Sequence, residues 1–168
     1  GSRNEKQLSD WLVQFAKDHG LRWIQDEMNN VIIYKAGTAG LEKAGAVILQ
    51  AHMDMVCVGA PDYVPERDPI HTCQKDGFLC TDGRSSLGAD CGIGLSAAMY
   101  LLKTNRPHVP LRLIFTVDEE RGLAGAKELQ SDCLDGCSAL INLDGFHFGE
   151  LMISSAGGRR QTFRRTPE

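Results

Sequence analysis

One histidine and several acidic residues follow the apolar runs of this sequence. His52 and Asp54 come directly after AVILQA, and Glu119 and Glu120 follow LRLIFTVD. Asp144 closes the run SALINLD. Apolar runs of this length are typical of buried strands, and a charge without a partner is costly to bury. These side chains are therefore either exposed at the surface or together hold a ligand.

Asp90 adds another carboxylate, at the entrance to a glycine-containing helical segment. In open α/β sheets, ligands bind beyond the carboxyl ends of the strands, where side chains far apart in the sequence converge. Several carboxylates brought together raise one another's pKa, and a bound cation relieves their repulsion. One histidine with several carboxylates suits zinc, cobalt or manganese. A carboxylate that is not a ligand can then serve as a general base for water.

Each of these features also has an ordinary structural explanation. A single His-x-Asp pair is most often an exposed polar pair, and acids after strands often begin loops or cap helices. Asp90 suits the N-terminus of its own helix. The segment GIGLSA, residues 92–97, matches a loose dinucleotide-binding pattern, but that pattern requires a buried strand immediately before it. The polar stretch TDGRSSLGADC precedes it here, which argues against nucleotide binding.

The elements that must position these residues begin with an amphipathic helix over residues 4–18. Its apolar residues recur at helical spacing, as Leu8, Trp11, Leu12 and Phe15. The preceding SRNE resembles a capping box, and a glycine at position 20 suits the C-terminal end of the helix.

Strands and helices alternate along the rest of the chain. The expected strands cover residues 21–25, 31–35, 46–50, 111–117, 138–144 and 150–156, and the further helices cover 90–103 and 123–130. Residues 58–86 are expected to form a long irregular excursion with a small hairpin near GFLC. The alternation predicts an α/β fold with a mixed, largely parallel sheet flanked by helices in three layers. The helix at 90–103 is expected to pack on this sheet through Ile93, Ala97 and Leu101.

Length, charge and cysteine usage restrict the class of protein. The chain has 168 residues, which suits one domain. Its formal net charge of -4 argues against a nucleic-acid partner, and no apolar stretch is long enough to cross a bilayer. The six cysteines form no CxxC pair, and a chain with this many apolar runs needs no disulfide staples. We expect reduced thiols, a cytoplasmic location and no membrane partner.

Five ordered blocks resemble the M20 family of metallopeptidases, and within it the aminoacyl-histidine dipeptidases, also called Xaa-His dipeptidases or peptidase D. The blocks are LQAHMDMV, SLGADCGIGLSAAMYLL, TVDEERGLAGAKEL, LINLDGFHFGEL and SSAGG. The similarity runs over nearly the whole chain. It implies a zinc-exopeptidase-like fold and metal-dependent hydrolysis of dipeptides of the Xaa-His type.

The resemblance implies two divalent metal ions that share one carboxylate. His52 and Asp144 match ligands of the first ion, Asp90 matches the bridging ligand, and Glu120 matches a ligand of the second ion. Zinc is the expected metal, with cobalt and manganese as alternatives. Glu119 matches the general base of the family.

The remaining carboxylate of the opening pattern also receives a role from the resemblance. Asp54 matches the residue that orients the metal-binding imidazole, which explains why an aspartate follows the histidine two residues later. The peptide bond after Asp90 is commonly cis in the family. Two departures stand out: Cys91 replaces the usual Asn or Asp, and GFHF replaces a usually acidic segment after Asp144. His147, within GFHF, is left without a role.

Family members are longer than this chain. They carry a second domain, used as a lid and for homodimerisation, and a late histidine that completes the second metal site. Residues 1–168 are therefore expected to form part of a metallopeptidase catalytic domain, without the lid domain and the C-terminal part. Such a chain is expected to bind at most one metal tightly and to show little peptidase activity alone. The alternatives are a non-catalytic remnant that binds a metal or a partner, or another M20 activity such as aminoacylase, carboxypeptidase or deacylase.

Overall fold

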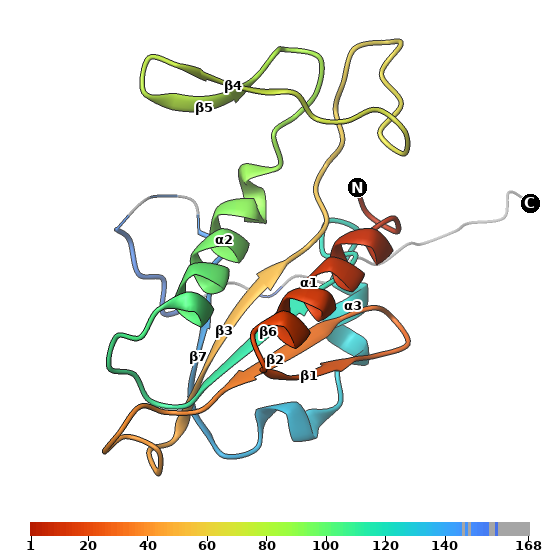
Figure 1. Ribbon diagram of the computed structural model, residues 1–168. Coiled ribbons are helices and arrows are strands. Elements are labelled where there is room, and N and C mark those ends of the chain that lie inside the picture. The colour runs from red at the N-terminus through yellow and green to blue at the C-terminus, as the bar shows by residue number, and fades with distance from the viewer. Residues whose placement is uncertain (146, 148, 155–156, 158–168) are drawn as a thin grey trace, which may run out of the picture.

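The computed structural model describes residues 1–145, 147, 149–154 and 157. Its centre is a five-stranded mixed sheet with helices on both faces, as Figure 1 shows, which confirms the expected three-layer α/β class. The strand order is β1-β2-β6-β3-β7. The strands are β1 (Arg22–Gln25), β2 (Val31–Lys35), β3 (Ala46–His52), β6 (Leu111–Thr116) and β7 (Cys137–Asn142).

The parallel part of the sheet is centred on β3. This strand pairs in parallel with β6 on one side and β7 on the other, whereas β2 pairs antiparallel with both β6 and β1. The register aligns His52 with Thr116 and Gln50 with Asn142. Because parallel strands end at the same edge of a sheet, the segments that follow β3, β6 and β7 emerge close together.

The larger of two cores lies between the sheet and two helices, α1 (Lys6–Asp18) and α2 (Ala89–Lys103). Ile33, Leu113 and Phe115 point into this core. In Figure 1 both helices cross the same face of the sheet. This arrangement places the N-terminal end of α2 near the carboxyl end of β3.

The smaller core occupies the opposite face of the sheet. Side chains alternate across a strand, so Ile32, Ile48 and Ile114 face away from α1 and α2. They pack against the region of α3 (Ala124–Glu128) and the 3-10 helix η1 (Ser131–Leu134). The helix expected at 123–130 is therefore shorter than predicted and is followed by this second short helix.

The buried face of α2 differs from the sequence expectation. Ile93 is 71% exposed, and Ala97 and Leu101 are also exposed. The helix instead packs on the sheet through a different set: Cys91, Gly94, Ala98, Met99 and Leu102. The sequence places apolar residues on all sides of this helix, so their spacing does not select one face.

The first helix also begins differently from the expectation. It starts at Lys6, and no side chain caps it, so the predicted capping box is wrong. Glu5 instead directs its carboxylate to the backbone of Asp118. The C-terminal end is as predicted: Gly20 has a φ of 63°, and the amides of Gly20 and Leu21 bond back to the last turn.

The excursion between β3 and α2 contains the expected hairpin. Its strands are β4 (Thr72–Lys75) and β5 (Phe78–Thr81), which form a separate two-stranded sheet that projects away from the main one (Figure 1). Asp76 and Gly77 both have positive φ, as the tight turn of a two-residue hairpin requires.

The strand expected at 150–156 is not formed in its described part, because residues 151–154 have no regular structure. Residues 155 and 156 lie outside the described residues, as does most of the SSAGG block. No helix in the described part of the chain is both long and apolar enough to cross a membrane.

Candidate metal centre

The candidate centre lies at the carboxyl edge of the parallel strands. His52 is the last residue of β3 and is only 2% exposed. Its Nε2 atom lies 3.1 Å from Oδ1 of Asp90, at the start of α2, and 3.7 Å from Oδ2 of Asp144, just after β7. The structure thus brings together three side chains that are distant in the sequence, and it does so around one imidazole nitrogen.

The second imidazole nitrogen fixes the direction of the ring. Nδ1 of His52 donates to the backbone carbonyl of Asp54 at 3.0 Å and lies 3.4 Å from its carboxylate. Because Nδ1 is held in this way, Nε2 is the nitrogen that faces the other carboxylates. The family resemblance implies an orienting role for the Asp54 carboxylate; in the structure the Asp54 carbonyl accepts the hydrogen bond from Nδ1, and the carboxylate lies beside it.

The charge state of His52 follows from this environment. Burial lowers the pKa of His52, but hydrogen bonds with Asp54 and Asp90 and the charge of Asp144 outweigh it and raise the pKa to about 9. The imidazolium is therefore the cation that these carboxylates share in the metal-free protein. A divalent ion would take the place of the proton on Nε2.

Asp54 connects this imidazole to the loop after β6. Its carboxylate accepts the amide of Glu119 at 2.9 Å and the amide of Glu120 at 3.2 Å. The hydroxyl of Ser2 donates to it as well, at 2.7 Å. Burial raises the pKa of Asp54, but the bonds to His52, to Ser2 and to the two amides together hold it well below its usual range. Asp54 is thus a buried anion fixed by several donors.

Glu119 and Glu120 lie close to the same imidazole. One ligand atom from each glutamate and one from His52 lie within 4.8 Å of one another. Burial raises the pKa of Glu119, and the neighbouring charges of Glu120 and Asp144 add to that effect, while His52 opposes it. A raised pKa lies closer to neutral pH, where a general base can both accept a proton and release it again.

Asp90 is followed by a residue that differs from the family pattern. The Asp90–Cys91 peptide bond is cis, as the resemblance implies. Cys91 is buried, and its sulfur lies within 4.8 Å of ligand atoms of His52 and Asp144. Burial raises the pKa of this thiol. The pKa of Asp144 is also raised, by burial and by the charge of Asp90.

The donor set fits a divalent metal ion. Among the described residues, no lysine or arginine forms an ion pair with Asp90, Glu119, Glu120 or Asp144. Among the described residues, His52 is the cation nearest to these carboxylates, and burial together with neighbouring carboxylates still raises the pKa of Glu119 and of Asp144. Carboxylate oxygens with one imidazole nitrogen are suitable ligands for zinc, cobalt or manganese.

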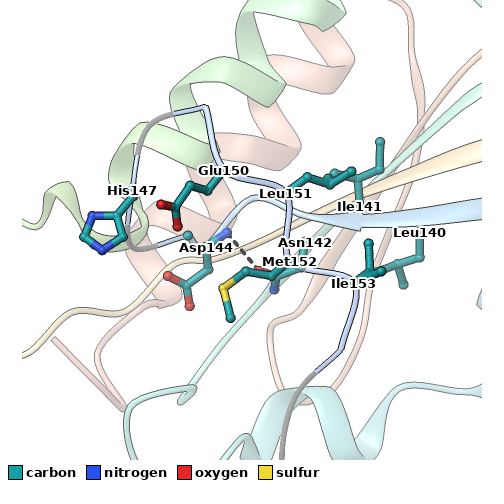
Figure 2. Close-up of a pocket in the computed structure, with 10 residues that line it drawn as sticks. Leu140, Ile141, Asn142, Asp144, His147, Glu150, Leu151, Met152 and Ile153 are labelled. Atoms are coloured by element: carbon teal, nitrogen blue, oxygen red, sulfur yellow. Dashed lines mark hydrogen bonds between the residues drawn. The ribbon is translucent and has the colours of Figure 1, made fainter.

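A cavity of about 490 Å³ opens beside Asp144. Figure 2 shows apolar side chains gathered at one end and His147, Glu150 and Asp144 at the other. The apolar end is formed by Leu140, Ile141, Leu151 and Ile153, while the side chain of Met152 extends toward Asp144 (Figure 2). The cavity therefore joins an apolar surface to the candidate ligands.

Sequence reasoning missed a further group of buried carboxylates next to the centre. Glu5, Asp54 and Asp118 each contribute an oxygen atom, and these atoms lie within 4.8 Å of one another. The backbone amide of Asp118 donates to Glu5 at 3.0 Å. No local pattern connects residues 113 positions apart, so only the folded chain shows this contact.

Comparison with known proteins gives consistent matches over most of the chain. Residues 30–165 match the model of peptidase family M28. The cytosol non-specific dipeptidase of Escherichia coli K12 is 39% identical over 160 residues, which cover 94% of this chain and 33% of that protein.

Solved structures agree with the sequence matches. Aminoacylhistidine dipeptidase from Vibrio alginolyticus superposes with a TM-score of 0.79 at 34% identity, over 86% of this chain and 30% of that one. A tripeptidase from Staphylococcus aureus superposes with a TM-score of 0.71 at 30% identity, over 84% of this chain and 38% of that one. The chain therefore spans about a third of the length of these relatives.

Proposed function

This chain belongs to peptidase family M28, and we propose that it supplies the general base and most of the metal ligands of a dinuclear metallodipeptidase. The resemblance to M20 metallopeptidases is confirmed at the level of the M20/M28 clan. Because the chain spans about a third of its relatives, we assign the activity to a longer protein, of which residues 1–168 form part of the catalytic domain.

The observation that carries the proposal is the convergence of His52, Asp90 and Asp144 around Nε2 of the histidine. We assign these three side chains to the first metal ion. Asp90 would bridge to a second ion, for which Glu120 is the other ligand in this chain. The family resemblance implies a further histidine ligand for that ion, and we expect it in the longer protein.

The residues of this chain divide the chemistry among them. Bound divalent ions would polarise the scissile carbonyl and lower the pKa of a water molecule. Glu119 takes the proton of that water and delivers it to the leaving amine, and its raised pKa supports this exchange. Asp54 keeps the imidazole of His52 in one orientation and at the same time holds the backbone of Glu119.

Short peptides are the substrates we propose, with Xaa-His dipeptides as the preferred class. The relatives that match are a non-specific dipeptidase, an aminoacylhistidine dipeptidase and a tripeptidase. The cavity beside Asp144 supports this choice, because Glu150 offers a carboxylate to an imidazole at one end and the apolar end suits an aliphatic side chain. We further propose that the longer protein is a cytoplasmic homodimer.

The test is a Glu119→Gln substitution in the longer, peptidase-active protein. It should abolish hydrolysis of Xaa-His dipeptides and leave the metal content near normal, because Glu119 is assigned to proton transfer and not to the metal. Glu128→Gln, at an exposed position of α3, is the matched control and should retain full activity. Retained turnover in Glu119→Gln would remove this residue from the role of base.

A further inference from the structure

The loop after β6 presents three consecutive backbone amides to buried carboxylates. The amide of Asp118 donates to Glu5 at 3.0 Å, that of Glu119 to Asp54 at 2.9 Å, and that of Glu120 to Asp54 at 3.2 Å. Asp118 has a φ of 52°, in the left-handed region. A left-handed residue turns successive amides to the same side of the chain and forms a concave site for anions.

Glu5 is not a surface residue and does not cap its helix. It is 6% exposed, precedes α1, and forms no ion pair with any of the described residues. A buried carboxylate without a cation is costly unless it is hydrogen-bonded. The amide of Asp118 supplies that bond. The buried carboxylate of Glu5 thus accepts its hydrogen bond from the backbone of the loop that carries Glu119 and Glu120.

We propose that Glu5 is a positioning residue: its carboxylate fixes the Asp118 amide and thereby sets the direction in which Glu119 and Glu120 leave the loop. Asp54 holds the next two amides, so the two carboxylates act on one continuous stretch of backbone. The roles of Glu119 and Glu120 rest on the proposed function, whereas the backbone clamp rests only on the contacts themselves.

The close grouping of Glu5, Asp54 and Asp118 is explained by the same clamp. Glu5 and Asp54 each already accept backbone donors, so their burial requires no bound ion. Asp118 lies 3.6 Å from the guanidinium of Arg3 through Oδ2, while its other oxygen is buried and has no hydrogen-bond partner in the described part of the chain. Asp118 thus adopts a left-handed conformation beside two other carboxylates. The hydrogen bond from its amide to Glu5 helps to hold that conformation.

Amide hydrogen exchange on the metal-free 168-residue chain tests the clamp without any assay of activity. Glu5→Met keeps the side-chain volume and removes the acceptor, whereas Glu5→Gln keeps an oxygen that can accept the same bond. We expect the amides of residues 118–120 to exchange at least about 10-fold faster in Glu5→Met, as for loss of a hydrogen bond to a charged group. In Glu5→Gln the exchange rates of these amides should stay within about 3-fold of those in the parent chain, because the amide oxygen of glutamine can accept the same hydrogen bond.

The control is Glu42→Met, which removes another glutamate that accepts a backbone amide, that of Gly40 at 2.9 Å, in an exposed loop. It should leave residues 118–120 unchanged. Amides of β3 and β6 report global stability in every variant. If the amides of Glu119 and Glu120 keep their protection in Glu5→Met, the clamp does not extend beyond Asp118 and the proposal is wrong. Equal acceleration in Glu5→Gln would overturn it as well.

A second measurement separates positioning from a purely structural role. In the longer, peptidase-active protein, Glu5→Met should lower kcat by about 10-fold to 100-fold, as the loss of an outer-shell partner does. KM should stay within about 2-fold, and Glu5→Gln should restore kcat. An unchanged kcat in Glu5→Met would refute the positioning role. Absence of peptidase activity in the unmodified protein would instead refute the proposed function and leave the exchange result to decide the clamp.

Discussion

Raising the pH should weaken the metal-free chain because His52 is stabilised as a cation. Its pKa is about 9 in the folded chain, against about 6.5 for an unperturbed histidine side chain. The folded state therefore holds the proton more tightly than the unfolded state does. This stabilisation is fully present below about pH 6.5 and is lost as the pH rises through about 9. The difference of roughly 2.5 pKa units corresponds to about 3.4 kcal/mol, at about 1.36 kcal/mol per unit.

Urea unfolding at a series of pH values, in the presence of a chelator, measures this loss directly. We expect the free energy of unfolding to fall by about 3 kcal/mol between pH 6 and pH 9. Asp54 does not contribute in this range, because its lowered pKa makes its own stabilisation disappear only at acid pH. His52→Gln is the control and should lose much less stability over the same range; what it loses near pH 9 comes from buried thiols such as Cys91, whose raised pKa favours the unfolded state once exposed thiols ionise. Equal slopes in the two proteins would show that His52 is not the titrating group.

Three further predictions concern the metal, the core and a buried amide. Calorimetric titration of the 168-residue chain with zinc should show at most one tight site, which His52→Ala should abolish; two tight sites would contradict the assignment of ligands. Met99→Ala should destabilise the chain by about 2–5 kcal/mol in urea unfolding, whereas Ile93→Ala should change stability by at most about 0.5 kcal/mol; the reverse order would restore the face expected from sequence. Asn30→Ala should cost at least about 2 kcal/mol, because the buried Asn30 amide accepts from the Val117 backbone and donates to the Gly125 carbonyl; an unchanged unfolding midpoint would refute that reasoning.

The convergence of the candidate ligands could be predicted from the sequence because it depends on where two strands end and one helix begins. The apolar runs before His52 and Asp144 are strong strand signals, and parallel strands end at a common edge. Asp90 was placed by the helix it begins. The distances among these side chains could not be predicted, because they depend on the registers that align β3 with β6 and β7.

Two of the expectations that were wrong share a physical cause, which is the effect of tertiary contacts on ambiguous local signals. The apolar residues of α2 surround the helix, so packing against the sheet selected Met99 and Leu102 and left Ile93 exposed. SRNE has the residue types of a capping box, but Glu5 bonds to a loop 113 positions away in the chain. In both cases the local pattern permits two structures, and contacts distant in sequence determine which one forms.

Asp54 contacts both the candidate metal ligand His52 and the loop that carries the candidate base, Glu119. Its backbone carbonyl and carboxylate face Nδ1 of His52, while the same carboxylate accepts the amides of Glu119 and Glu120. One buried anion therefore sets both the direction of the imidazole and the position of the loop with the two glutamates. A change in the loop must alter the contacts of Asp54, and through them the orientation of His52. The candidate ligand and the candidate base are thus coupled through a carboxylate that is proposed to bind neither metal nor substrate.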